Sequence, residues 1–194
     1  MGTERFDVVI EALVASPIHS YEGRPGDGPR PTSGDSRESI EIRAGLGVVG
    51  DRYFGRAAHR LASVTVMAAE SLDHVATALG LGRLDPGLAR RNIVIRGAGV
   101  DSWRGRRFSL DTGGGPVEFE AHRPANPCAW MDMVYAPGAF RELRGRGGMR
   151  CSPITDGALR LGPATLLLHP DDPTAPSPAA RMKEKTSPNR PGSA

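Results

Sequence analysis

The chain lacks any run of about 18 consecutive apolar residues, so it contains no predicted transmembrane helix. Three of its first seven residues are charged, and they lead directly into a strand-like segment without the apolar core and cleavage site of a signal peptide. We therefore expect a cytoplasmic protein with no membrane partner.

Cysteine is scarce, because only Cys128 and Cys151 occur in 194 residues. In the cytoplasm two cysteines are normally thiols, and a disulfide between them would require Cα atoms within about 7 Å. The sequence has no C-x-x-C pair and no histidine pair at metal-ligand spacing, which argues against a structural zinc site.

Lysine is almost absent, since Lys183 and Lys185 are the only two and the other basic residues are arginines. The net charge of +3 is mildly basic. An excess of arginine can reflect genome composition, or it can serve bidentate recognition of phosphate and carboxylate groups. The sequence leaves both interpretations open.

Aromatic residues make up only 5% of the chain, which limits one class of function. Proteins that bind single-stranded nucleic acid interleave stacking aromatics with basic residues. Only Tyr53 and Phe54, between Arg52 and Arg56, have that arrangement. We therefore predict no nucleic-acid partner.

Short apolar segments separated by glycine and proline turns dominate the rest of the chain. Strands are predicted at 6–15, 38–43, 62–67, 93–95, 103–110, 116–122, 152–155 and 158–168, and helices at 68–79 and 137–144. The strands do not alternate regularly with long helices, which argues against a doubly wound sheet. The pattern predicts a mostly β fold, an antiparallel β-barrel with two or three short helices.

One domain is predicted over residues 1–170. Within it, residues 22–37 are rich in glycine, proline and serine and are predicted to form a mobile surface loop. Residues 171–194 contain almost no bulky apolar side chain, so they are predicted to form a disordered tail.

The stretch from His122 to Asp132 carries the most distinctive chemistry. It follows an alternating strand, and Pro124 and Pro127 cannot donate hydrogen bonds to a neighbouring strand, so a stiff loop is expected there. That loop presents Cys128, either as a reactive thiol or as a small buried side chain, because free cysteine also packs like a small hydrophobic residue.

Three further segments carry candidate binding residues. Residues 45–55 contain four glycines with Asp51 and Arg52 at the apex, which suits either a simple turn or an arginine presented to an anionic ligand. Arg91 and Asn92 stand where a buried strand begins, a position from which side chains converge on a pocket. Residues 145–150 form a second glycine-rich basic loop.

Taken in order, these segments resemble a known family. Val49-Gly50-Asp51-Arg52, Arg91-Asn92-Ile93-Val94-Ile95, Asn126-Pro127-Cys128 and Gly145-Arg146-Gly147-Gly148-Met149-Arg150 with Asp156-Gly157 resemble the MOSC family. This domain occurs at the C-terminus of molybdenum cofactor sulfurases and also as free-standing proteins. The resemblance covers residues 6–168.

The resemblance implies a β-barrel that handles the molybdenum cofactor or sulfur destined for it. The cysteine matching Cys128 would ligate molybdenum or carry persulfide sulfur, and Arg52 and Arg146 would contact the phosphate of the pterin. Arg91, Asn92 and Asn126 are the other cofactor-binding residues expected from the motifs. Pyridoxal phosphate binding is a further property that the family resemblance suggests.

Two functions follow from the resemblance. The first is a molybdenum-cofactor-dependent reductase of N-oxygenated small molecules, which needs an electron-donor protein. The second is a non-catalytic carrier of sulfur or cofactor that receives its cargo from a sulfur donor. The chain departs from the family where Tyr53 and Phe54 replace a frequent histidine, and where Arg91 replaces a frequent acidic residue. Trp130 is expected to line the pocket beside Cys128.

Overall fold

The computed structural model describes residues 2–19 and 35–170. The strands are β1 (Glu4–Leu13), β2 (Ser39–Arg43), β3 (Gly47–Val48), β4 (Val64–Ala68), β5 (Ile93–Arg96), β6 (Arg107–Asp111), β7 (Val117–Pro124), β8 (Met149–Pro153), β9 (Gly157–Arg160) and β10 (Gly162–Leu168). The α-helices are α1 (Glu70–Leu79), α2 (Trp130–Val134) and α3 (Ala139–Glu142), and η2 (Ala57–His59) and η3 (Pro86–Ala89) are short 3-10 helices.

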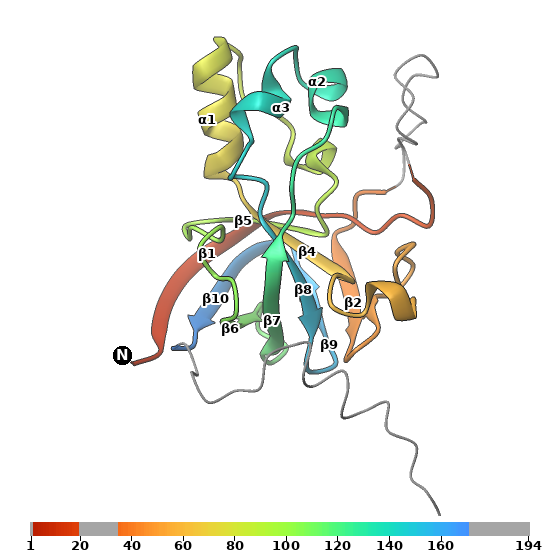
Figure 1. Ribbon diagram of the computed structural model, residues 1–194. Coiled ribbons are helices and arrows are strands. Elements are labelled where there is room, and N and C mark those ends of the chain that lie inside the picture. Colours follow the sequence, from red (N-terminus) through yellow and green to blue (C-terminus); the bar gives the residue numbers. More distant parts are fainter. Residues whose placement is uncertain (1, 20–34, 171–194) are drawn as a thin grey trace, which may run out of the picture.

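Seven of these strands close into a barrel in the order β1-β10-β6-β7-β8-β4-β5, with β5 returning to β1 (Figure 1). The mostly β class and the barrel are confirmed, but the prediction that the barrel is antiparallel is wrong. β4 and β5 run parallel, with Val66 opposite Ile93, while the other barrel pairs are antiparallel. The reason is the connection, because α1 carries the chain back to the end where β4 began, as parallel neighbours require.

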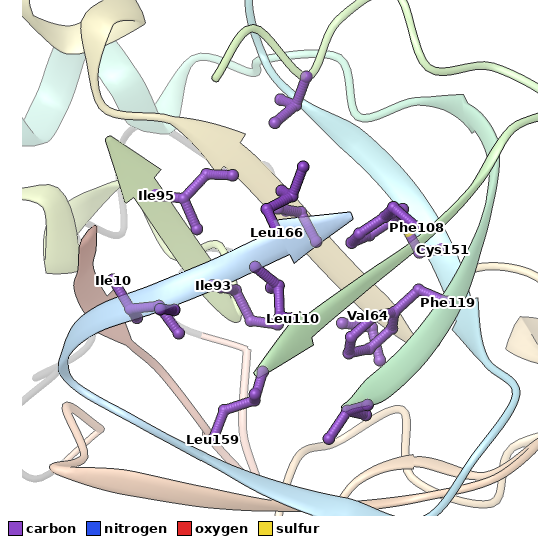
Figure 2. Close-up of a cluster of buried hydrophobic side chains, with 14 of the residues drawn as sticks. Ile10, Val64, Ile93, Ile95, Phe108, Leu110, Phe119, Cys151, Leu159 and Leu166 are labelled. Carbon is purple, nitrogen blue, oxygen red and sulfur yellow. The ribbon is translucent and has the colours of Figure 1, made fainter. Parts of the chain in front are cut away.

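The barrel interior is filled by side chains that alternate along the strands, as expected when one face of each strand is buried. Phe108 and Phe119 are fully buried and stack with ring centroids 5.1 Å apart. Figure 2 shows Phe108, Leu110, Phe119, Cys151 and Leu166 pointing toward one another from β6, β7, β8 and β10.

A layer of helices covers the outside of β4 and β5 (Figure 1). Met67 and Val94 turn away from the barrel interior and pack with Leu72, Val75 and other side chains of this layer. Because both of its faces are covered, all five residues of β4 are buried. In the described part of the chain, no helix is long and apolar enough to cross a membrane.

A three-stranded sheet, β3-β2-β9, lies beside the barrel and shares its core. Ile42, Val48 and Leu159 of this sheet are fully buried in the same cluster as the barrel interior. The sheet therefore holds the 45–55 turn firmly against the barrel wall.

The predicted loop 22–37 falls mostly outside the described residues, and the predicted tail 171–194 falls wholly outside them. The described end of the loop is fixed to β1. The amide of Ala15 donates to Asp35 O at 3.0 Å, and the amide of Arg37 donates to Leu13 O at 2.9 Å.

Candidate functional site

Asp51 organises the turn that presents Arg52. Its carboxylate accepts hydrogen bonds from the amide of Tyr53 at 3.0 Å and the amide of Ser16 at 3.4 Å. The Arg52 amide donates to Ser16 O at 2.8 Å, so the turn is tied to the end of β1. Asp51 therefore fixes this turn by accepting hydrogen bonds from backbone amides.

Asn92 joins four segments beneath this turn. Its side-chain oxygen accepts from the amide and the hydroxyl of Thr65, both at 2.9 Å. Its side-chain amide donates to Val14 O at 3.0 Å and to Asp51 Oδ2 at 3.1 Å. Both donor hydrogens and the acceptor oxygen are therefore engaged within the protein. Asn92 thus has a structural role, because it holds the segments of the site together.

Arg91 joins the two loops that the sequence singled out. Its Nε donates to Gly147 O at 2.8 Å, and its Nη2 donates to Ala125 O at 2.9 Å and Asn126 O at 3.4 Å. Burial, together with the charge of Arg150, lowers the pKa of Arg91 to about 10. A guanidinium that is 9% exposed and bonded only to carbonyls keeps a positive charge in the wall of the site.

A cavity of about 40 Å³ lies between these elements. Its lining consists of Val14, Asp51, Arg52, Tyr53, Thr65, Arg90, Arg91, Asn92 and Arg150. Four arginines thus face one carboxylate, and that carboxylate is already occupied by backbone amides and Asn92. A volume of this size holds a few water molecules or one small oxyanion.

The four arginines of the cavity differ in how they are neutralised. Arg90 forms an ion pair with Asp35 at 2.6 Å and adopts the left-handed conformation, φ 52°. Arg52 lies 4.0 Å from Asp51 and stacks 4.5 Å above the Tyr53 ring, and among the described residues its buried Nε has no hydrogen-bond partner. Arg91 and Arg150 have no ion pair within that same part of the chain.

Arg150 is a site residue that sequence reasoning missed. It lies opposite Thr65 in the β4–β8 pair, and its neighbours Met149 and Cys151 point into the barrel. Alternation along β8 therefore turns Arg150 outward into the cavity. Burial, followed by the charge of Arg123, lowers the pKa of Arg150. The sequence does contain a signal for this position: apolar Met149 and Cys151 flank Arg150, which is the alternation of a strand with Arg150 on its outer face.

Cys128 is exposed in the loop between β7 and α2. The loop is anchored by the amide of Ala125, which donates to Gly148 O at 2.8 Å, and by Cys128 O, which accepts from the amide of Met131 at 3.0 Å. The thiol does not line the cavity, but it lies close enough to interact electrostatically with two of the cavity arginines. A negative charge on Cys128 would raise the pKa of Arg91 and of Arg150. Burial has the larger effect and lowers both pKa values.

The other predicted residues lie elsewhere. Asn126 and Arg146 are exposed and are not part of the cavity lining. Trp130 is 3% exposed in the core of the helical layer, where its Nε1 donates to Leu88 O at 2.8 Å. The expectation that Trp130 lines a pocket beside Cys128 is therefore wrong, because α2 begins at this residue and turns its ring under the helices.

The two cysteines have different surroundings, and this difference gives a testable result. Both are free thiols; Cys151 is completely buried in the barrel, and burial raises its pKa. Brief treatment of the native protein with iodoacetamide should alkylate Cys128 at least about tenfold faster than Cys151, since only an accessible thiolate reacts. Intact-mass spectrometry should show one adduct, and none in Cys128→Ser. Equal labelling of both thiols would contradict the burial of Cys151.

Within residues 2–19 and 35–170, no group of three or more His, Cys, Asp and Glu side chains converges to hold a metal ion. The exposed sulfur of Cys128 is a ligand type that suits soft metal centres.

Solved structures share this fold. The YuaD protein from Bacillus subtilis aligns with a TM-score of 0.66 at 17% identity, over 87% of this chain and 99% of its own. YiiM from Escherichia coli aligns with a TM-score of 0.52 at 15% identity, over 84% of this chain and 69% of its own. No curated protein sequence matches the chain closely enough to count as a relative.

Residues 55–164 match the MOSC domain, which is more than half of the chain. This match confirms the resemblance drawn from the four sequence segments, three of which lie within it. The chain therefore belongs to the MOSC domain family, which is associated with binding of the molybdenum cofactor.

Proposed function

We propose that this protein binds the molybdenum cofactor, with Cys128 as the protein ligand to molybdenum and the arginine cavity as the site for the cofactor's phosphate. The observation that carries the proposal is the pairing of an exposed free thiol with a small cavity lined by four arginines and one occupied carboxylate. The thiol and the cavity share electrostatic neighbours in Arg91 and Arg150.

The residues fit such a group chemically. The cavity volume of about 40 Å³ suits a phosphate group and not a whole pterin, so the rest of the cofactor would lie outside it, toward Cys128. Arg52, with its unpartnered buried Nε, and Arg91 and Arg150, without ion pairs among the described residues, would donate to phosphate oxygens. Bound there, the cofactor would supply a redox-active molybdenum centre beside the thiol.

As the reaction, we propose reduction of N-oxygenated small molecules. Removing the oxygen as water consumes two electrons and two protons, and the electrons would come from a separate electron-donor protein. The protein's own part is to hold the cofactor through Arg52, Arg91 and Arg150 and to fix Cys128 on a loop that Arg91 ties to the 145–148 segment.

The alternative is a carrier that holds sulfur or cofactor on Cys128 without turnover. One observation favours it, namely that Cys128 is exposed on a surface loop and not enclosed in the cavity. A thiol in that position is open to a second protein that delivers or collects sulfur.

The molybdenum content of purified protein tests the proposal. Wild type produced in a host that makes the cofactor should contain close to one molybdenum and one pterin per chain. Cys128→Ser should lose at least about ninety per cent of the molybdenum, because serine is a much poorer ligand for a soft metal. Cys151→Ala is the matched control and should keep it, since Cys151 lies inside the barrel.

The other outcomes separate the two functions. Molybdenum in Cys128→Ser at the wild-type level would rule out Cys128 as the ligand. If wild type contains no molybdenum, a cyanide-labile sulfur that appears after treatment with a cysteine desulfurase, and is missing in Cys128→Ser, would establish the carrier. Failure of both assays would remove both functions.

A further inference from the structure

The arginines around Cys128 extend beyond the cavity. Arg123 lies directly opposite Arg150 in the β7–β8 pair and is exposed on the strand that leads into the Cys128 loop. Arg146 is exposed in the loop before β8. The residue after it, Gly147, accepts the hydrogen bond from Arg91 and lies close to the backbone of Ala125. We call Arg123 and Arg146 the outer arginines.

Among the described residues the outer arginines form no direct ion pair, although Asp101 attracts Arg146 from beyond 4.0 Å. Asp101 accepts from the amide of Gly148 at 2.8 Å, and Asp132 accepts from the amide of Phe140 at 2.7 Å. In the described part of the chain, neither outer arginine forms an ion pair within 4.0 Å. Asp101 attracts Arg146 electrostatically but is bonded to the Gly148 amide and forms no ion pair with Arg146 within 4.0 Å, so it offsets the charge of Arg146 only in part.

Several arginines elsewhere on the surface are neutralised. Arg43 pairs with Glu41 at 2.5 Å, Arg96 with Glu11 at 2.5 Å and Asp73 at 2.6 Å, and Arg106 with Glu4 at 2.7 Å. Arg91, Arg123, Arg146 and Arg150 have no such pair among the described residues, and all four lie on the strands and loops next to the Cys128 loop. Charge of one sign around a recess attracts small molecules of the opposite sign and raises their association rates about 10- to 1000-fold.

We propose that the Cys128 site selects anionic small molecules, meaning substrates that carry a carboxylate or another oxyanion, and that Arg123 and Arg146 determine this specificity. This inference rests on the proposed function, because only a protein that turns over a substrate at Cys128 can select one there. If the cofactor's phosphate occupies the cavity, it takes up Arg52, Arg91 and Arg150. The outer arginines lie outside the cavity lining and remain to meet the substrate.

The test compares two disulfide reagents on cofactor-free full-length protein, made in a host without molybdenum. One is the doubly negative dithiobis-nitrobenzoate and the other is the neutral dithiodipyridine. In each reaction the Cys128 thiolate attacks a reagent sulfur, the reagent's S–S bond breaks, a mixed disulfide forms and one aryl thiolate leaves. Both reagents need the same thiolate, so the ratio of the two rates does not depend on how much of Cys128 is ionised.

The measured quantity is the rate constant with the anionic reagent divided by the rate constant with the neutral reagent. At low ionic strength this ratio should be at least about tenfold higher for the protein than for β-mercaptoethanol, which carries no arginines. It should fall toward the β-mercaptoethanol value near 0.5 M salt, where charges are screened within roughly 5 Å. The Arg123→Gln, Arg146→Gln double variant should lower the ratio at least about threefold. The charge-retaining Arg123→Lys, Arg146→Lys variant should restore it.

Arg160→Gln is the matched control, because Arg160 is also exposed and lies at the end of β9, away from the Cys128 loop. It should leave the ratio unchanged. A wild-type ratio equal to that of β-mercaptoethanol, or a ratio that the double variant does not change, would overturn the proposal. The assay uses no molybdenum, so its failure is distinct from a failure to bind the cofactor.

Discussion

Gly148→Ala should lower the free energy of unfolding by about 4 kcal/mol, the largest effect that we expect from any one substitution near the site. Gly148 has φ +85°, a conformation that L side chains rarely adopt. A Cβ at this position would overlap the carbonyl oxygen of Val66 and lie 2.9 Å from Met67 Cα. Both contacts are with the backbone of β4, so β4 would have to move away from β8 to remove the overlap.

Gly145→Ala separates the two causes. Gly145 has φ +75°, but a Cβ there meets nothing within 4 Å, so only the backbone conformation is penalised, by about 1 kcal/mol. Urea unfolding followed by circular dichroism gives both values. If Gly148→Ala costs no more than Gly145→Ala, the close approach of the 145–148 loop to β4 is not a constraint in solution.

Arg91→Met should lower the free energy of unfolding by about 3 kcal/mol, because it leaves the carbonyls of Gly147 and Ala125 without their donor. The same change should weaken the stabilisation of the protein by inorganic phosphate, since one of the cavity arginines is lost. Thermal unfolding with phosphate, compared with chloride at equal ionic strength, measures both effects in one experiment.

Arg160→Met is the control for Arg91→Met, because exposed substitutions usually change stability by less than about 0.5 kcal/mol. A different result would also be informative. If Arg91→Met is as stable as wild type, the cost of burying an unpaired charge equals the gain from its three hydrogen bonds. The phosphate effect would then show whether the charge is kept for a ligand.

Local features of the fold could be predicted from the sequence. Asp85 accepts from the amide of Gly87 at 2.8 Å and caps η3, a role that an aspartate directly before a proline favours. Gly80 ends α1 in the left-handed conformation that a terminal glycine supplies. Such features depend on a few adjacent residues, so the chemistry of those residues determines them.

Features that depend on distant partners could not be predicted in the same way. The parallel pairing of β4 with β5 follows from the path of the chain through α1, which periodicity does not reveal. Arg146 and Arg150 belong to one motif, yet Arg146 lies on an exposed loop and Arg150 lines the cavity. Their difference is set by where β8 begins, and that start depends on pairing with β4 and β7.

The way the barrel closes has a consequence for synthesis of the protein. β10 fits between β1 and β6, so the first strand of the described residues pairs with the last one. During synthesis, the backbone hydrogen-bonding groups on one edge of β1 stay unpaired until residues 162–168 have left the ribosome. An unpaired strand edge invites association with other chains, so the pairing of residues 162–168 with β1 is the step that protects it. A nonsense mutation before residue 162 should therefore yield an aggregating product and not a smaller folded domain.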